Sequence, residues 1–218
     1  MSSIVSGTIF KIKIPFNLGY AYCKVIDFSA LSIYNGVLVK VYDFFSEESI
    51  KSVDFFKELP LLLNEIPMFR MPTLKGKHKW ERIGVLKEEK DAFIPAYKIC
   101  QREGFAFDTI ESYESEKWYA LINYKEELGP LPFKGVRHLE ELYLRSTVTI
   151  ERRIAMAFLR TKSIDVEVFF QKQTIDNNWL TEFNCQRVIP QYKDIPEPIR
   201  GRPLVKGYVP DEYLNFEW

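Results

Sequence analysis

The chain has 218 residues, of which 46% are hydrophobic and 28% are charged, an ordinary globular usage that excludes a disordered, collagen-like or coiled-coil chain. Thirty basic residues balance thirty acidic ones, so no net field exists to collect nucleic acid or anionic lipid by charge alone. The 15% share of aromatic residues favours strands and interaction surfaces over a plain helical bundle.

The N-terminal segment predicts a meander of three strands. Residues 9–14, 20–28 and 37–44 are rich in strand formers and are separated by turn residues. Asn35-Gly36 lies between the last two runs and is typical of a type I′ hairpin turn, because both residues accept a positive φ. We therefore expect a strongly curved antiparallel sheet or half-barrel, one face of which other elements must cover.

The middle of the chain predicts one short helix between further strands. Residues 50–59 place apolar side chains at helical spacing, and Pro60 interrupts this helix because proline removes a backbone hydrogen bond and clashes with the preceding turn. Residues 87–91 are expected to be a solvated charged loop, and Gly129-Pro-Leu-Pro132 a rigid loop. The expected strands are residues 68–71, 80–85, 93–100, 105–110 and 117–124.

The C-terminal third predicts two helices followed by a second hairpin. Residues 136–144 and 147–162 have helical character. The arginines of the second helix that we expect to face solvent or acidic neighbours are Arg152, Arg153 and Arg160. Residues 164–170 then alternate apolar and polar side chains, residues 176–178 are turn formers, and residues 179–189 predict the returning strand.

Residues 190–218 combine several prolines with aromatic side chains, which predicts an extended strap packed on the body rather than a disordered tail. All elements together predict an α+β fold that is mostly β. It has a strongly curved antiparallel sheet or half-barrel at the N-terminus, a few short helices and a C-terminal β-hairpin. We expect residues 1–162 to form one β-rich domain, and residues 163–218 to pack on it as hairpin and strap.

The cysteines and the N-terminus indicate a cytoplasmic protein. Cys23, Cys100 and Cys185 are odd in number, far apart and without a CxxC pair, so reduced thiols are expected rather than a disulfide framework or a zinc site. The N-terminus lacks the pattern of a secretory signal, and no run approaches the ~18 apolar residues of a membrane span.

Known catalytic patterns are absent from the sequence. His78 and His138 are its two histidines, and neither has a metal-ligand partner at a spacing such as HExxH. The GxSxG, GxxxxGK[ST] and GxGxxG motifs of serine hydrolases, nucleoside triphosphatases and dinucleotide-binding proteins do not occur. We therefore expect no catalytic residues, no metal and no cofactor, with a hydrolase lacking any of these motifs as a remote alternative.

Two segments could contact a macromolecule. In the first, lysines flank a tryptophan, a combination that clamps phosphates and stacks a base. The residues of this candidate nucleic-acid contact are Lys75, Lys77, Lys79 and Trp80. The alternative is a set of ordinary loop lysines before a strand, with the tryptophan in the core. The balanced charge of the chain favours this alternative, since it supplies little of the counterion-release energy that nucleic-acid binding uses.

The second segment is acidic. Between residues 103 and 127, seven acidic residues face only Lys117 and Lys125, and aromatic residues lie among them. Such a composition suits a surface that meets a basic protein, because aromatic side chains anchor the partner while carboxylates steer it. The candidate partner-binding residues are Glu111, Tyr113, Glu114, Glu116, Trp118 and Tyr119. The alternative is a plain solvent-exposed strand and loop.

Several short strings resemble a known family. They are Gly7-Thr-Ile-Phe-Lys-Ile-Lys-Ile-Pro15, Gly19-Tyr-Ala-Tyr-Cys-Lys-Val25, Val41-Tyr-Asp-Phe44 and Lys77-His-Lys-Trp-Glu-Arg-Ile-Gly84, with looser pieces at residues 139–142 and 149–154. The helical tract at residues 52–64 agrees in its position. In these strings the chain resembles the immunity protein 26 family of bacterial polymorphic toxin systems, over about residues 6–158.

This resemblance implies a mostly β protein that binds and neutralises a cognate toxin, often a nuclease, and it implies no catalytic residues. Residues after 162 have no counterpart in the family. We therefore expect an intracellular antitoxin whose partner is a toxin protein. The alternative is a nucleic-acid-binding module that uses the basic segment.

Overall fold

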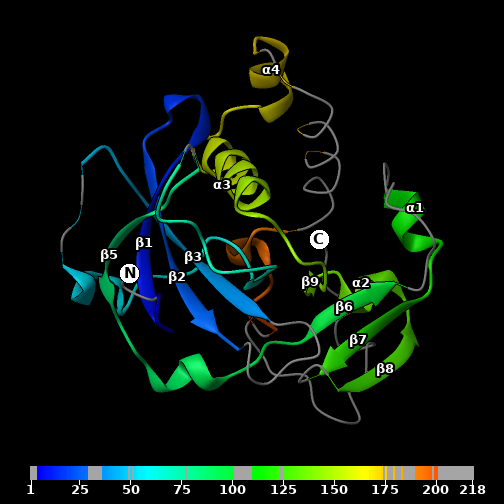
Figure 1. Ribbon diagram of the computed structural model, residues 1–218. Coiled ribbons are helices and arrows are strands. Elements are labelled where there is room, and N and C mark those ends of the chain that lie inside the picture. The colour runs from blue at the N-terminus through cyan, green and yellow to red at the C-terminus, as the bar shows by residue number, and fades with distance from the viewer. Residues whose placement is uncertain are drawn as a thin grey trace. The chain divides into compact units, whose positions relative to one another are not determined.

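The computed structural model describes residues 4–28, 36–48, 50, 52–76, 78–100, 110–122, 125–173, 175, 179, 183, 190–197 and 199–200. The chain forms two compact units, drawn in Figure 1. Unit 1 comprises residues 1–92 and 143–175, and unit 2 comprises residues 93–142 and 176–218. The predicted division between residues 162 and 163 is not among these boundaries and stays a prediction. The predicted fold class is confirmed: the structure is α+β and mostly β, with two sheets that do not close into a barrel.

Unit 1 is built on a five-stranded antiparallel sheet with the order β4-β3-β2-β1-β5. Its strands are β1 (Thr8–Lys13), β2 (Tyr20–Asp27), β3 (Val37–Ser46), β4 (Ile66–Met68) and β5 (Glu81–Val85). The predicted meander is therefore confirmed, and the turn η1 (Pro15–Asn17) joins its first two strands. The Phe28 amide donates to the Gly36 carbonyl at 2.9 Å, so Gly36 extends the ladder. Asn35, the other residue of the predicted type I′ turn, lies outside the described residues.

The helix α3 (Thr147–Thr161) covers one face of this sheet. The strand period of two places Phe10, Cys23 and Val41 in register on that face. Phe158 of the helix packs edge-on against Phe45 of β3, with ring centroids 4.8 Å apart. The predicted helix at residues 147–162 is thus confirmed.

The helix α3 has a capped N-terminus, and its arginines differ in burial. Ser146 is the N-cap, because its side chain accepts a hydrogen bond from the Thr149 amide at 3.2 Å. Of the three arginines predicted to face solvent or acidic neighbours, Arg153 is buried and so does not face solvent. Arg152 and Arg160 are half-buried.

The opposite face of the sheet carries aromatic side chains under the single turn η3 (Val53–Phe56). Phe56 is buried between the rings of Tyr22, at 5.1 Å, and Tyr42, at 5.3 Å. The predicted helix at residues 50–59 therefore shrinks to one 3-10 turn, which presents its apolar side chains to the sheet as expected. Gly84 permits this close approach, since a Cβ at Gly84 would lie 2.6 Å from Val53 Cγ1.

Unit 2 contains a four-stranded sheet with the order β8-β7-β6-β9. The elements of unit 2 are β6 (Tyr97–Cys100), α1 (Ile110–Glu114), β7 (Trp118–Ile122), β8 (Glu126–Leu131), α2 (Phe133–Val136), β9 (Glu140–Glu141) and the turn η5 (Tyr192–Asp194). Tyr113, Trp118 and Phe133 form the centre of its apolar core, with ring centroids 5.1–5.7 Å apart. Burial of these large rings contributes favourably to the stability of unit 2.

Two predictions in unit 2 are wrong. The expected rigid loop at residues 129–132 is the end of β8, where the edge of the sheet tolerates Pro130 because its missing N–H is not needed there. The expected helix at residues 136–144 does not form: α2 ends at Val136, and Glu140–Glu141 instead form β9, which pairs in parallel with β6. The predicted strand at residues 105–110 lies outside the described residues, except that Ile110 begins α1.

The predicted C-terminal hairpin is also wrong at its first strand. Residues 164–170 form the helix α4 (Val166–Gln171), because the Asp165 carboxylate accepts a hydrogen bond from the Val168 amide at 2.9 Å. Val166 and Phe170, four residues apart, are the buried face of this helix, whereas Val168 is exposed. Most of the returning strand, and the strap beyond residue 200, lie outside the described residues.

Candidate functional site

The candidate partner-binding residues lie together in unit 2, on α1, the following turn and the start of β7. Glu111 is in α1, Glu114 is exposed at its end, and Glu116 is half-buried in the turn. Tyr119 is half-buried on β7. The segment therefore offers carboxylates at the surface, as its composition predicts.

Tyr113 and Trp118, the other two candidates, are core residues rather than surface anchors. Both are 0% exposed, and their rings stack with an interplanar angle of 1° and a centroid distance of 5.7 Å. Trp118 Nε1 donates to the Tyr113 carbonyl at 2.7 Å. This bond and the stack attach α1 to β7 and thereby hold Glu114 and Glu116 in place.

The aromatic ring of the candidate nucleic-acid segment is not accessible for stacking. Lys75 and Lys79 are exposed, and Lys77 lies outside the described residues. Trp80, however, is buried, with its ring 5.9 Å from Phe10 in an edge-to-face arrangement. A base cannot stack on this ring, so the reading of Trp80 as a core residue is confirmed.

Glu151 of α3 explains why Trp80 is fixed in the core. Its carboxylate accepts from Trp80 Nε1 at 3.0 Å, and its second oxygen lies 3.0 Å from His78 Nδ1. Glu151 is itself buried. One carboxylate thus joins α3 to the segment that leads into β5, a link between residues more than 70 positions apart.

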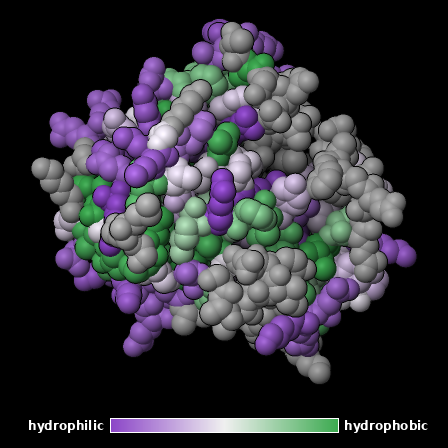
Figure 2. All heavy atoms as spheres, viewed as in Figure 1, coloured by the Kyte–Doolittle hydropathy of each residue, from purple (hydrophilic) through white to green (hydrophobic). Residues whose placement is uncertain are grey.

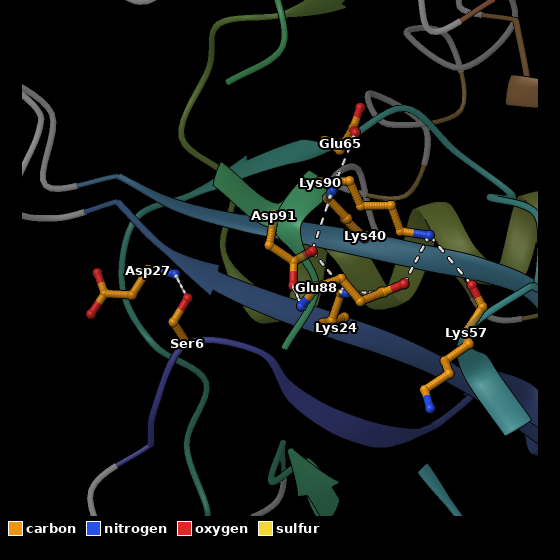
Figure 3. A network of polar contacts seen from close by, with 9 residues as sticks. All are labelled: Ser6, Lys24, Asp27, Lys40, Lys57, Glu65, Glu88, Lys90 and Asp91. Atoms are coloured by element: carbon orange, nitrogen blue, oxygen red, sulfur yellow. Dashed lines mark hydrogen bonds and ion pairs between the residues drawn. The ribbon is translucent and has the colours of Figure 1, made fainter. Parts of the chain in front are cut away.

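A buried ionic network lies on the face of the unit 1 sheet that α3 does not cover (Figure 3). Lys24 of β2 and Lys40 of β3 are directly opposite each other in the ladder, where two like charges destabilise a sheet. Lys24 is 1% exposed and contacts Glu88 Oε2 and, at 2.7 Å, Asp91 Oδ1. Lys40 lies 3.6 Å from Asp91 and 3.9 Å from Glu65. Asp91 therefore bridges the two lysines.

Two carboxylates of this network, Glu88 and Asp91, come from the segment around η4 (Glu89–Ala92), which the sequence predicts to be a solvated loop. That prediction is wrong for Glu88 and Asp91, which are half-buried. Burial by itself would raise the pKa of Glu88, but hydrogen bonds from Lys24 and Lys90 outweigh it and lower this pKa. The ion pairs keep Glu88 charged inside the protein.

Cys23 lies beside the network on β2, with its side chain on the other face of the sheet. Burial raises the pKa of the Cys23 thiol. A protonated, buried thiol is a poor nucleophile, which confirms the interpretation of Cys23 as a small apolar core residue.

The Tyr22 hydroxyl anchors the segment that leaves β3. It lies 2.9 Å from Ser46 Oγ and 3.0 Å from the Glu48 carbonyl, and it accepts a hydrogen bond from the Ile50 amide at 3.1 Å. One side chain thus satisfies several polar groups at the edge of the aromatic cluster. The sequence shows the aromatic residue but not these partners.

Tyr22→Phe is expected to lower the free energy of unfolding by about 1–2 kcal/mol, because it removes the hydroxyl that accepts from the partly buried Ile50 amide and donates to the Glu48 carbonyl. Tyr42→Phe is the matched control. Tyr42 packs on the same Phe56 ring, but its buried hydroxyl has no hydrogen-bond partner among the described residues. Urea unfolding followed by circular dichroism should show a loss for Tyr22→Phe and little change for Tyr42→Phe, and equal losses would contradict this.

Unit 2 contains a buried lysine and a buried histidine side by side in its interior. Lys98 of β6 donates to the carbonyls of Arg137, at 3.1 Å, and Leu139, at 2.6 Å, and its ammonium lies 5.4 Å from the centre of the Phe133 ring. His138 is also buried. Burial, and next the charge of Lys98, lower the pKa of His138 from 6.5 to about 3. His138 is therefore neutral at pH 7.

Neither a metal centre nor a membrane span emerges from the part of the chain that the structure describes. In that part, His, Cys, Asp and Glu side chains nowhere gather in a group of three or more that could hold a metal ion. None of its helices combines the length and the apolar character needed to cross a membrane. The described residues thus define an α+β protein in which the buried lysines Lys24 and Lys40 of one sheet are paired with carboxylates.

Comparison with known proteins assigns a family to the N-terminal part. Residues 5–104, slightly less than half of the chain, match the family model of Immunity protein 26, which supports over these residues the resemblance found in the sequence. The match spans β1 to β6 and includes the ionic network and the aromatic face of unit 1. The looser resemblances at residues 139–142 and 149–154 lie outside it. No curated protein and no solved structure matches the chain.

Proposed function

We propose that this chain is an immunity protein that binds a cognate bacterial toxin in the cytoplasm and neutralises it without catalysis. The match of residues 5–104 to Immunity protein 26 is the observation that carries this proposal. An inhibitor of this kind works by occupying the surface that the toxin uses. It needs a stable scaffold and a complementary surface rather than reactive groups.

The surface that we propose in unit 2 is formed by Glu111, Glu114, Glu116 and Tyr119. The stack of Tyr113 and Trp118 supports it from below, which limits the entropy lost when a partner binds. Carboxylates at the rim of an interface speed the encounter with a basic partner. A nuclease toxin, which needs a basic surface for its phosphate-containing substrate, is the partner class that suits this surface.

The experiment is co-expression of this chain with the toxin domain that each adjacent gene encodes, in a bacterial host. We expect one of these domains to stop growth alone, to be harmless together with this chain, and to co-purify with it. If every adjacent toxin domain remains toxic and none forms a complex, the proposed function is wrong.

The unit 2 surface is tested in the same system with two variants of equal charge change. Glu114→Lys combined with Glu116→Lys should slow association with the toxin. Glu126→Lys combined with Glu127→Lys, on exposed positions of β8, is the control for a purely long-range effect of charge. Equal effects of both pairs would assign the loss to overall charge rather than to this surface.

The nucleic-acid alternative is not proposed, because the described residues no longer favour it. Its aromatic residue, Trp80, is buried and bonded to Glu151. Exposed lysines such as Lys75 and Lys79 are common on protein surfaces.

A further inference from the structure

A second surface of unit 1 has the features of a protein interface, and it lies within the segment that matches the family. Phe55, on η3, is 43% exposed although it belongs to an aromatic cluster. Its ring packs edge-on against Phe44 at 4.7 Å and against Phe56 at 5.4 Å. In Figure 2, hydrophobic and hydrophilic residues lie side by side at the left of the molecule, where Figure 1 draws the cyan turn of η3.

The ring of Phe55 is held rigidly. Phe44 and Phe56, its two neighbours, both pack on Tyr22, at 5.6 and 5.1 Å. Tyr22 is buried, and its hydroxyl ties down the adjoining segment through Glu48 and Ile50. An aromatic side chain that is already ordered loses little entropy when a partner covers it, which is the property of an interface hot spot.

Among the described residues of the stretch 47–58, the charge that is left without an ion pair is negative. Lys57 is paired with Asp54 at 2.7 Å, and Lys90 is paired with Glu88 at 3.0 Å. The exposed carboxylates of this region that make no ion pair among the described residues are those of Glu47, Glu48 and Glu58. By sequence the stretch 47–58 contains four acidic residues against two lysines, of which Lys51 lies outside the described residues. A basic partner is therefore complementary to this surface.

We propose that Phe55, with Glu47, Glu48 and Glu58, forms a docking surface for a basic face of the cognate toxin, an inference that rests on the proposed function. An arginine or lysine of the toxin lies over the Phe55 ring, where the negative face of the aromatic ring attracts a cation. The carboxylates at the rim accept hydrogen bonds from further basic side chains. The surface proposed in unit 2 consists of other residues, so variants of each set distinguish the two proposals.

The test measures binding of the full-length chain to the toxin domain from the adjacent gene, by surface plasmon resonance at several salt concentrations. Phe55→Ala is expected to weaken binding about tenfold or more, mainly through faster dissociation. Phe69→Ala is the matched control, because Phe69 is the more exposed aromatic residue of unit 1, at 65%, and lies beyond β4. It should leave binding within about twofold of the wild type.

A second variant protects the test against misfolding. Glu47→Lys combined with Glu48→Lys changes two exposed side chains, and it should slow association and reduce its salt dependence. If Phe55→Ala lowers the thermal midpoint of the chain, its loss of binding could reflect unfolding. The association rate of the Glu47/Glu48 variant then decides whether this surface binds the toxin.

The outcomes separate the inference from the proposed function. If the wild type binds and neutralises the toxin while the Phe55 and Glu47/Glu48 variants bind as well as it does, the docking surface is wrong and the proposed function stands. A loss as large for Phe69→Ala also overturns the assignment to Phe55. If the wild type binds no toxin from an adjacent gene, both fail together.

Discussion

Lys24→Met is expected to lower the free energy of unfolding by about 3–5 kcal/mol, the usual result of removing one partner from a buried ion pair. Methionine replaces the aliphatic part of the lysine but not its charge. Glu88 and Asp91, both largely enclosed, then lose the one ammonium group among the described residues that contacts them both. Lys40, 3.6 Å from Asp91, and Lys90, 3.0 Å from Glu88, each contact only one of the two carboxylates.

Lys90→Met is the matched control for this variant. Lys90 also pairs with Glu88, at 3.0 Å, but its side chain is 62% exposed. Exposed pairs contribute about 0.2–1 kcal/mol, because water screens them and the long side chain loses entropy. Urea unfolding at pH 7 and two salt concentrations measures both variants. Comparable losses would show that the network is solvated rather than buried.

Acidification is expected to destabilise unit 2 through His138. In the folded protein the pKa of His138 is lowered to about 3, whereas the unfolded chain binds a proton near pH 6.5. The unfolded state therefore holds more protons between these values. The contribution of neutral His138 to stability is complete above about pH 6.5, falls by about 1.4 kcal/mol per pH unit as the pH drops, and is exhausted near pH 3.

His138→Gln removes this titration, so its unfolding free energy should fall less steeply below pH 6 than that of the wild type. Over two pH units the difference between the slopes amounts to ~2–3 kcal/mol. Carboxylates contribute equally to both proteins and cancel in the comparison. His78→Gln, which removes the other histidine of the chain, should retain the steep slope. Identical slopes for the wild type and His138→Gln would contradict the neutral, buried state of His138.

The sheet of unit 1 is the part of the fold that the sequence predicts best. Its strands alternate or run apolar over six to ten residues and are separated by turn formers, so local pattern and tertiary structure agree. The helix α3 is equally predictable, because its buried residues recur at helical spacing behind the cap Ser146.

Elements that depend on distant partners were not predictable. The alternation in residues 164–170 suits a strand, but the Asp165 cap and the burial of Val166 and Phe170 make it a helix. Likewise β9 exists only because Glu140 and Glu141 pair with β6, about 40 positions earlier in the chain. Propensity is a weak guide to such short segments, since tertiary contacts override it.

The candidate site was predicted only at the level of composition. Within residues 111–119, Glu114 is exposed, so this part of the acidic segment does place a carboxylate at the surface. The sequence could not show that the aromatic residues there split into a buried stack of Tyr113 and Trp118 and a half-buried Tyr119, since that depends on packing around Phe133. The ionic network was missed because Lys24 and Lys40 meet their carboxylates only after the sheet has formed.

The pairing of Lys24 with Lys40 has a consequence for folding. If β2 slipped by one residue against β3, every side chain of the slipped strand would turn to the other side of the sheet. Lys24 would then enter the apolar layer beneath α3, at a cost of several kcal/mol for an unpaired ammonium group. A misregistered hairpin is therefore not stabilised when α3 packs on the sheet. The position of Lys24 thus favours the native register of β2 against β3 over a register shifted by one residue.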